Sequence, residues 1–240
     1  ELAGNQIYNM SEDEFLKVKN TIEKGSVKCC GFNAALTPDI TFVGEGFDID
    51  KARDYAELLC QRGKELNIKA IGIGSPKSRK FKYGDDESKA WEQAKQFLDI
   101  FSDVAKKYGI TVMYESLNRT ESEFGLKIRE GAELVADMNK ENLKIVFDIY
   151  HMNMENEGLD DLMYSIPYIY HIHIAERVGE ERRYPSDKLY DYYKRVLTPV
   201  IKLGYDGAIC TEAFDGDVRE GAERSIKLLK KLVAEIEGEA

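Results

Sequence analysis

Short apolar runs alternate with amphipathic stretches along most of this chain. The apolar runs are rich in β-branched residues, as is typical of strands. They lie at 27–34, 68–75, 110–116, 143–149, 168–175 and 207–213. Between them, apolar residues recur at three- and four-residue spacing, which predicts helices. We expect one helix near 11–24, a second that begins at residue 50, and a third, long helix that ends at residue 107. Further helices are expected near 127–140, 155–165, 188–203 and 218–236.

Polar residues at the edges of these stretches predict where several helices begin and end. Ser11 and Glu14 have the spacing of a capping box, and Asp50 is the expected N-cap of the second helix. Gly109 follows the long helix as a C-terminal stop.

The strict alternation predicts a parallel sheet with helical crossovers. The chain opens on "ELA", which has the pattern of the end of a strand. Six full strands, this stub and seven helices predict a (β/α)8 TIM barrel forming a single domain over residues 1–240. In this interpretation the chain starts near strand two, and a first βα unit of roughly 30 residues precedes Glu1.

The competing architecture is an open, doubly wound parallel sheet that binds a dinucleotide. Such a sheet carries the G-x-G-x-x-G fingerprint after its first strand. The segment "GIGSPK" (72–77) has the first two glycines of that pattern and lacks the third. The barrel is therefore the better prediction.

Composition narrows the function classes. Of 240 residues, 43% are apolar and 32% are charged, as in a globular protein, and no apolar run reaches the about 18 residues that would span a membrane. The net charge of −10 disfavours nucleic acid as a ligand. The four cysteines form no C-x-x-C pair, which disfavours a zinc knuckle or a disulfide framework and favours a cytoplasmic protein.

Four successive predicted strands carry a metal-ligating residue near their C-terminal ends. These residues are Glu115, Asp148, His173 and Glu212. In a barrel, all these ends meet at one face. Three carboxylates alone would repel one another, and a divalent cation would remove that conflict. The ligand set favours Mn²⁺ or Co²⁺ and also suits Mg²⁺ or Zn²⁺. A strand-end acid taken singly is more often a helix cap or an ion-pair partner, so the prediction depends on the four residues together.

The chain has only three histidines, His151, His171 and His173. Two of them alternate within one predicted strand, so their side chains point to the same side. Either His171 or His173 can then serve as the ligand, with the other as its packed neighbour. His151 follows Asp148 by three residues, just past a strand end, where a substrate would be met or where an ordinary loop histidine would lie.

From about residue 88 onward the sequence resembles the xylose-isomerase-like TIM-barrel superfamily, and most of all its ketose 3-epimerases of the D-tagatose and D-allulose type. The segments that carry this resemblance are "YESLNRTE" (114–121), "FDIYHMNMEN" (147–156), "YHIHIAE" (170–176), "RRYP" (182–185) and "CTEAF" (210–214). The resemblance implies a sugar substrate, one divalent metal ion and association into a homo-oligomer.

The resemblance also implies roles for individual residues. The metal ligands would be Glu115, Asp148, His173 and Glu212, and the catalytic pair would be Glu115 and Glu212. Glu121 and His151 would bind the substrate. The family also places an arginine after the H-x-H segment, for which we select Arg183, with Arg177 and Arg182 as alternatives in a loop that is longer than usual.

The expected reaction is epimerisation through an enediolate, in which one glutamate removes a proton and the other returns it to the opposite face. One base acting alone would give aldose–ketose isomerisation. Alternatives on the same scaffold are an inosose or hydroxypyruvate isomerase, a dehydratase and a catalytically silent sugar-binding protein. An apurinic endonuclease is disfavoured, because its trimetal site needs more than three histidines and the acidic net charge opposes DNA binding.

The loop "GIGSPKSRK" (72–80) carries Lys77, Arg79 and Lys80 at a predicted strand end. Such a loop can hold a phosphate through side chains and backbone N–H groups, or it can be a solvated basic surface.

Overall fold

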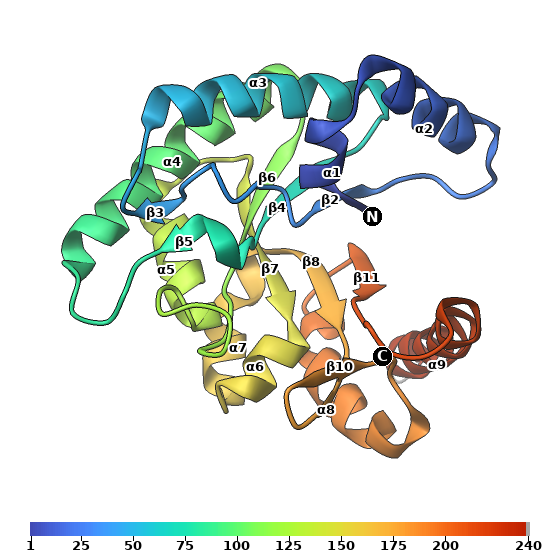
Figure 1. Cartoon of the computed structure of the whole chain (residues 1–240). Coiled ribbons are helices and arrows are strands. Elements are labelled where there is room, and N and C mark those ends of the chain that lie inside the picture. The colour runs from blue at the N-terminus through green and yellow to red at the C-terminus, as the bar shows by residue number, and fades with distance from the viewer. Residues whose placement is uncertain (239–240) are drawn as a thin grey trace.

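A seven-stranded parallel sheet forms the centre of the computed structural model, which describes residues 1–238 (Figure 1). Its strands, in spatial order, are β1 (Leu2–Ala3), β2 (Gly31–Asn33), β4 (Ala70–Ile73), β6 (Thr111–Glu115), β7 (Leu143–Asp148), β8 (Ile169–Ile174) and β11 (Ala208–Thr211). Every neighbouring pair in this sheet is parallel.

The spatial order of these strands follows their order along the chain. A doubly wound sheet would instead reverse its strand order at a switch point, so the curled, sequential sheet is that of a barrel. Six strands and a short first strand agree with the pattern expected from the sequence. Within the described residues, the outer strands β1 and β11 do not pair with each other.

Helices cover the outside of the sheet (Figure 1). They are α1 (Gly4–Asn9), α2 (Glu12–Lys24), α3 (Ile49–Glu65), α4 (Glu87–Lys107), α5 (Ile128–Met138), α6 (Ile149–Met154), α7 (Leu159–Ser165), α8 (Tyr190–Lys202) and α9 (Val218–Gly238). The sequence pattern did not predict α1 and α6, because six residues are too few for a 3.6-residue period to emerge. Within residues 1–238, no helix has the length and apolar composition needed to cross a membrane.

The capping box of Ser11 and Glu14 opens α2 as predicted. The expected N-cap Asp50 is wrong, because Asp48 holds this position and accepts hydrogen bonds from the amides of Asp50 (3.0 Å) and Lys51 (3.1 Å). Both aspartates lie near the start of the helix, and only the extended backbone at Asp48 suits a cap.

Two small ribbons lie over the C-terminal ends of the large sheet. One joins β3 (Val43–Gly44) to β5 (Arg79–Lys80) in parallel, and the other is an antiparallel hairpin of β9 (Glu176–Val178) and β10 (Glu181–Arg183). Three short 3₁₀ turns complete the described structure, at Pro76–Ser78, Ile166–Tyr168 and Asp187–Leu189.

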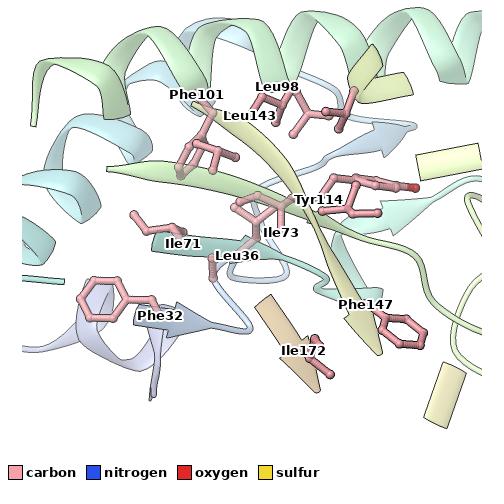
Figure 2. Close-up of a cluster of buried hydrophobic side chains, with 14 of the residues drawn as sticks. Phe32, Leu36, Ile71, Ile73, Leu98, Phe101, Tyr114, Leu143, Phe147 and Ile172 are labelled. Atoms are coloured by element: carbon pink, nitrogen blue, oxygen red, sulfur yellow. The ribbon is translucent and has the colours of Figure 1, made fainter. Parts of the chain in front are cut away.

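The main core lies between the sheet and the helices. Ile71, Ile73, Tyr114, Phe147 and Ile172 of the sheet belong to one buried cluster with Leu98 and Phe101 of α4 (Figure 2). The residues between them along each strand point the opposite way, and Ala70, Met113 and Val146 form a separate small cluster inside the barrel. Because successive side chains alternate, Glu115, which follows Tyr114, and Asp148, which follows Phe147, point to the inner face at the ends of their strands.

Candidate active site

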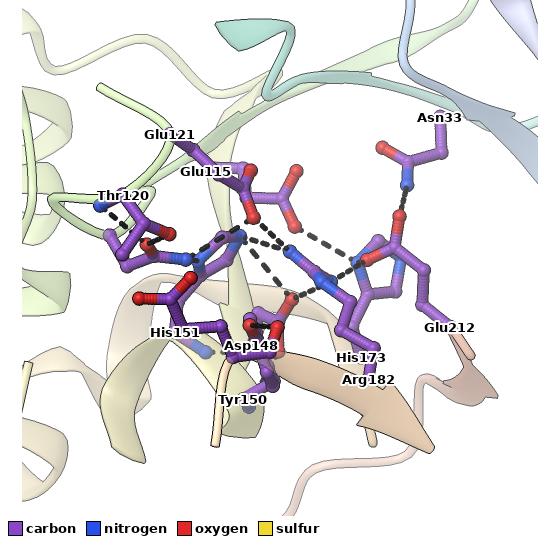
Figure 3. A network of polar contacts seen from close by, with 12 residues as sticks. Asn33, Glu115, Thr120, Glu121, Asp148, Tyr150, His151, His173, Arg182 and Glu212 are labelled. Carbon is purple, nitrogen blue, oxygen red and sulfur yellow. Dashed lines mark hydrogen bonds and ion pairs between the residues drawn. The ribbon is translucent and has the colours of Figure 1, made fainter. Parts of the chain in front are cut away.

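Glu115, Asp148, His173 and Glu212 converge at the C-terminal end of the barrel (Figure 3). One potential ligand atom of each lies within 4.8 Å of those of the other three. Nδ1 of His173 is 3.0 Å from Oε1 of Glu115 and 3.6 Å from Oε2 of Glu212. The structure thus brings together all four residues that the sequence suggested as metal ligands.

Two neighbouring residues position the carboxylates: Gly74 leaves space for Glu115, and Asn33 hydrogen-bonds to Glu212. Gly74 follows β4, and a Cβ atom at this position would lie 1.8 Å from Oε2 of Glu115. Only glycine therefore leaves the Glu115 carboxylate its present place. Asn33 of β2 donates a hydrogen bond from Nδ2 to Oε1 of Glu212 at 2.9 Å. Sequence reasoning missed both residues, because nothing local links them to glutamates far along the chain.

His173, rather than His171, faces the carboxylates. Oε2 of Glu1 lies 3.0 Å from Nε2 of His173 and 3.2 Å from Nε2 of His171, which is one layer deeper in the barrel. Glu1 therefore holds one ring nitrogen of His173 and leaves Nδ1 directed at the cluster. A carboxylate behind a ligand histidine commonly fixes the ring orientation in metal sites.

Arg182 enters the cluster from β10. Its Nη1 lies 3.0 Å from Oδ2 of Asp148 and also donates to Glu212, while Nη2 lies 3.2 Å from Oε1 of Glu121. Nη2 also lies 2.7 Å from Nε2 of His151. The guanidinium thus supplies the positive charge that the acids require.

Arg183, our sequence-based choice for the substrate-binding arginine, does not reach the cluster. It is exposed and pairs with Glu181, with 2.6 Å between Nη2 and Oε2. Neighbouring residues on a strand point to opposite sides, so Arg182 and Arg183 cannot both point inward. The hairpin register, in which Arg182 lies opposite Arg177, decides which one does. Arg177 is also exposed and donates to the Asn153 carbonyl.

His151 and Glu121 flank the cluster. His151 is buried, and its Nδ1 lies 2.9 Å from Nδ2 of Asn118. Since Arg182 faces the other ring nitrogen, both nitrogens of His151 meet donors, and a neutral ring can accept only one of these hydrogen bonds. Glu121 is half-buried at the rim, next to a cavity of about 600 Å³ that also contacts Tyr150, Arg182 and Phe214.

Burial and charge shift the pKa values of these groups in different directions. Burial, and then the charge of Glu115, raise the pKa of Glu212 to about 7. Burial also acts to raise the pKa of Asp148, but the charges of His151 and Arg182 outweigh it and lower that pKa. Burial lowers the pKa of His151, which favours the neutral ring. The Glu212 carboxyl thus keeps its proton more readily than Asp148, as expected where acids are crowded.

The donor set fits a divalent metal ion. Three carboxylates and one imidazole nitrogen provide hard ligands with a single nitrogen, a set that Mn²⁺, Co²⁺, Mg²⁺ and Zn²⁺ all accept. Arg182 contacts Oδ2 of Asp148 and Oε2 of Glu212, so a cation bound through these two oxygens would make the guanidinium withdraw from them. That withdrawal would also remove one of the two donors that compete at His151.

Known proteins are similar to this chain in sequence and in fold. D-psicose 3-epimerase from Agrobacterium fabrum is 25% identical over 219 residues, which are 89% of this chain and 74% of that protein. A crystal structure of D-psicose 3-epimerase in the presence of D-fructose has a TM-score of 0.75 at 20% identity, covering 95% of this chain and 85% of that one. The structure of IOLI protein with a zinc atom has a TM-score of 0.71 at 16% identity, covering 96% and 84%.

The family model described as xylose isomerase-like TIM barrel matches residues 1–232. This match confirms both the barrel fold and the resemblance predicted from the sequence. The chain therefore belongs to the xylose isomerase-like TIM-barrel family.

Proposed function

We propose that this protein is a divalent-metal-dependent sugar epimerase, and specifically a ketose 3-epimerase. The observation that carries the proposal is the placement of two glutamates, Glu115 and Glu212. Their strands are separated in the sheet by β7 and β8, yet both side chains belong to the same cluster of potential metal ligands. The match to D-psicose 3-epimerase supports the choice of a ketose as substrate.

Glu115, Asp148, His173 and Glu212 would hold the metal. A bound divalent cation would neutralise the carboxylates and stabilise negative charge on the sugar oxygens as a proton leaves carbon. Mn²⁺ and Co²⁺ suit the oxygen-rich set best, and the zinc in the IOLI structure shows that this fold can hold a divalent ion.

The protein residues would perform the proton transfers. Glu115 and Glu212 approach from opposite sides of the barrel mouth, so one can remove a proton from the reacting carbon and the other can return it to the opposite face. Glu121, His151 and Arg182 would bind and orient the hydroxyl groups of the sugar. Arg182 takes this role in place of Arg183 because it is the arginine directed inward.

The test is a screen of ketoses and ketose phosphates with added Mn²⁺ or Co²⁺ in deuterated water, followed by NMR. A 3-epimerase should exchange the C3 proton with solvent and form the C3 epimer. Formation of an aldose would indicate the isomerase alternative instead. If sugars bind and no carbon-bound proton exchanges, the protein is a sugar-binding member of the family and the proposal is wrong.

A further inference from the structure

A basic cavity of about 840 Å³ opens beside the metal-ligand cluster. We propose that this cavity binds the phosphoryl group of the substrate, so that the preferred substrate is a ketose phosphate. The proposal rests on the proposed function for the sugar end of the substrate. The lining residues that carry the argument are Lys77, Lys80, Lys82, Arg119 and Glu121.

The cavity and the cluster share a wall. Lys77 and Lys80 lie after β4, and Arg119 and Glu121 lie after β6, at the same barrel face as the metal ligands. Glu121 lines the cavity and also contacts Arg182, which reaches into the cluster (Figure 3). One elongated ligand could therefore place its carbonyl end at the cluster and its other end among the cations.

The charge of this cavity is opposite to that of the molecule. The whole chain has a net charge of −10, yet four exposed cations line this opening. Lys82 lies 3.8 Å from Glu123, and Arg119 is paired with Glu155. Within residues 1–238, Lys77 and Lys80 have no ion-pair partner, although Glu45 also lines the cavity. An uncharged sugar would leave these two ammonium groups unpaired, whereas a phosphoryl group would pair with them.

Hydrogen bonds and strand pairing anchor the segments that carry these cations. Arg79, between the two lysines, is buried and donates hydrogen bonds to the carbonyls of Phe124 and Gly125, each at 3.1 Å. It also donates to the Glu115 carbonyl, which ties the loop to a strand of the site. β5 contains Lys80 and pairs with β3 (Figure 1). Arg119 is held by two contacts of its Nε with Glu155, at 3.1 Å each, and one of its Nη2, at 2.7 Å. A binding site that is already ordered loses less entropy when the ligand arrives.

The first experiment measures binding without turnover. Inorganic phosphate and a ketose phosphate are titrated by calorimetry into the protein and into Lys77→Ala/Lys80→Ala. We expect the double variant to bind the ketose phosphate about tenfold or more weakly, as for loss of hydrogen bonds to a charged group. The matched control, Lys227→Ala/Lys230→Ala, removes two exposed lysines of α9 and should bind as the parent does.

The second experiment compares kcat/KM for a ketose and its phosphate ester with the metal supplied. The ester should have the higher kcat/KM, and this preference should fall with added salt. The Lys77→Ala/Lys80→Ala variant should lose the preference, while its kcat/KM for the free ketose should change little.

The outcomes separate the two proposals. If free ketoses turn over but the ester binds no more tightly than the free ketose, the phosphoryl site is overturned and the epimerase proposal stands. Binding of the ester through Lys77 and Lys80 without turnover would support the site and contradict the epimerase. Binding of inorganic phosphate alone would overturn the assignment to the substrate.

Discussion

Gly74 controls the position of Glu115 because it leaves no side chain in the space of the carboxylate. In Gly74→Ala the new methyl group should push that flexible carboxylate aside while the strand stays in place. We expect metal affinity to fall about tenfold or more, as when the neighbours of ligands are changed, with a small change in stability. Calorimetric titration with Mn²⁺ and a thermal melt measure both. Gly238→Ala, where a methyl group meets nothing within 4 Å, is the control. Unchanged metal affinity in Gly74→Ala would remove Glu115 from the ligand set.

Glu212 is both a proposed ligand and a proposed proton carrier, and Glu212→Gln separates the two roles. The amide keeps one carbonyl oxygen for the metal but cannot exchange a proton. Metal affinity should fall moderately, and turnover should fall by a factor of roughly 10² or more. His151→Ala is the comparison: metal binding should survive, and the damage should appear in substrate affinity. Near-normal turnover in Glu212→Gln would make Glu212 a structural ligand and favour a one-base isomerase.

The hairpin of β9 and β10 matters as an element because it delivers Arg182 to the acids. In Arg182→Met the carboxylates lose this buried counter-charge, which should lower the free energy of unfolding of the metal-free protein by roughly 3 kcal/mol. Added Mn²⁺ should restore more stability to this variant than to the parent, since the ion no longer competes with the guanidinium. Denaturant unfolding with and without metal measures this. An equal gain in both proteins would mean that Arg182 and the metal do not compete.

The start of α5 has a pH-sensitive contact. Glu157 accepts a hydrogen bond from the amide of Ile128 at 3.0 Å, and burial raises the pKa of Glu157 to about 8 from an ordinary value of 4.5. The folded state therefore holds this proton more tightly than the unfolded state. The stability that this provides is fully present below pH 4.5 and is lost as pH rises through 8.

Glu157→Gln should remove this component of the pH dependence. Its free energy of unfolding should decline less than that of the parent between pH 4.5 and 8, as measured by urea unfolding across this range. Glu23→Gln, at an exposed position on α2, is the control and should follow the parent. A Glu157→Gln profile parallel to that of the parent would contradict the assignment.

At the scale of the whole molecule, the proposed metal would link four consecutive strands of the sheet, from β6 to β11. The last of these is an edge strand of half-buried residues, which gains most from such a link. Free metal at 100 times its dissociation constant would add about 2.7 kcal/mol to the free energy of unfolding. For a chain of this size the Tm should rise by roughly 5–10 °C.

A thermal melt with Mn²⁺ and then with excess chelator checks this prediction, and chelation should reverse the shift. Asp148→Asn should reduce the shift strongly, because it weakens a proposed ligand. A metal-induced shift of equal size in Asp148→Asn would place the ion elsewhere. The homo-oligomer expected from the resemblance stays a prediction, which light scattering on the purified protein would test.

Much of this protein follows from its sequence alone. A repeat of apolar runs and amphipathic stretches is local information, and it was enough to predict the sheet, most of the helices and the barrel. The positions of Glu115, Asp148, His173 and Glu212 near the C-terminal ends of successive strands likewise placed them together, because these ends meet at one face of a barrel. The two-residue error in the N-cap of α3 and the two missed helices concern short segments, where local patterns are weakest.

Only the tertiary structure decided how the site is completed. Arg182 instead of Arg183 faces the acids because of the register of a small hairpin, and both arginines have the same sequence neighbourhood. Glu1 contacts Nε2 of His173, Asn33 holds Glu212 and Gly74 makes room for Glu115, each across a large separation in sequence. Periodicity determines which side of an element a residue occupies. The partner it meets there depends on how distant elements pack, and no local pattern contains that information.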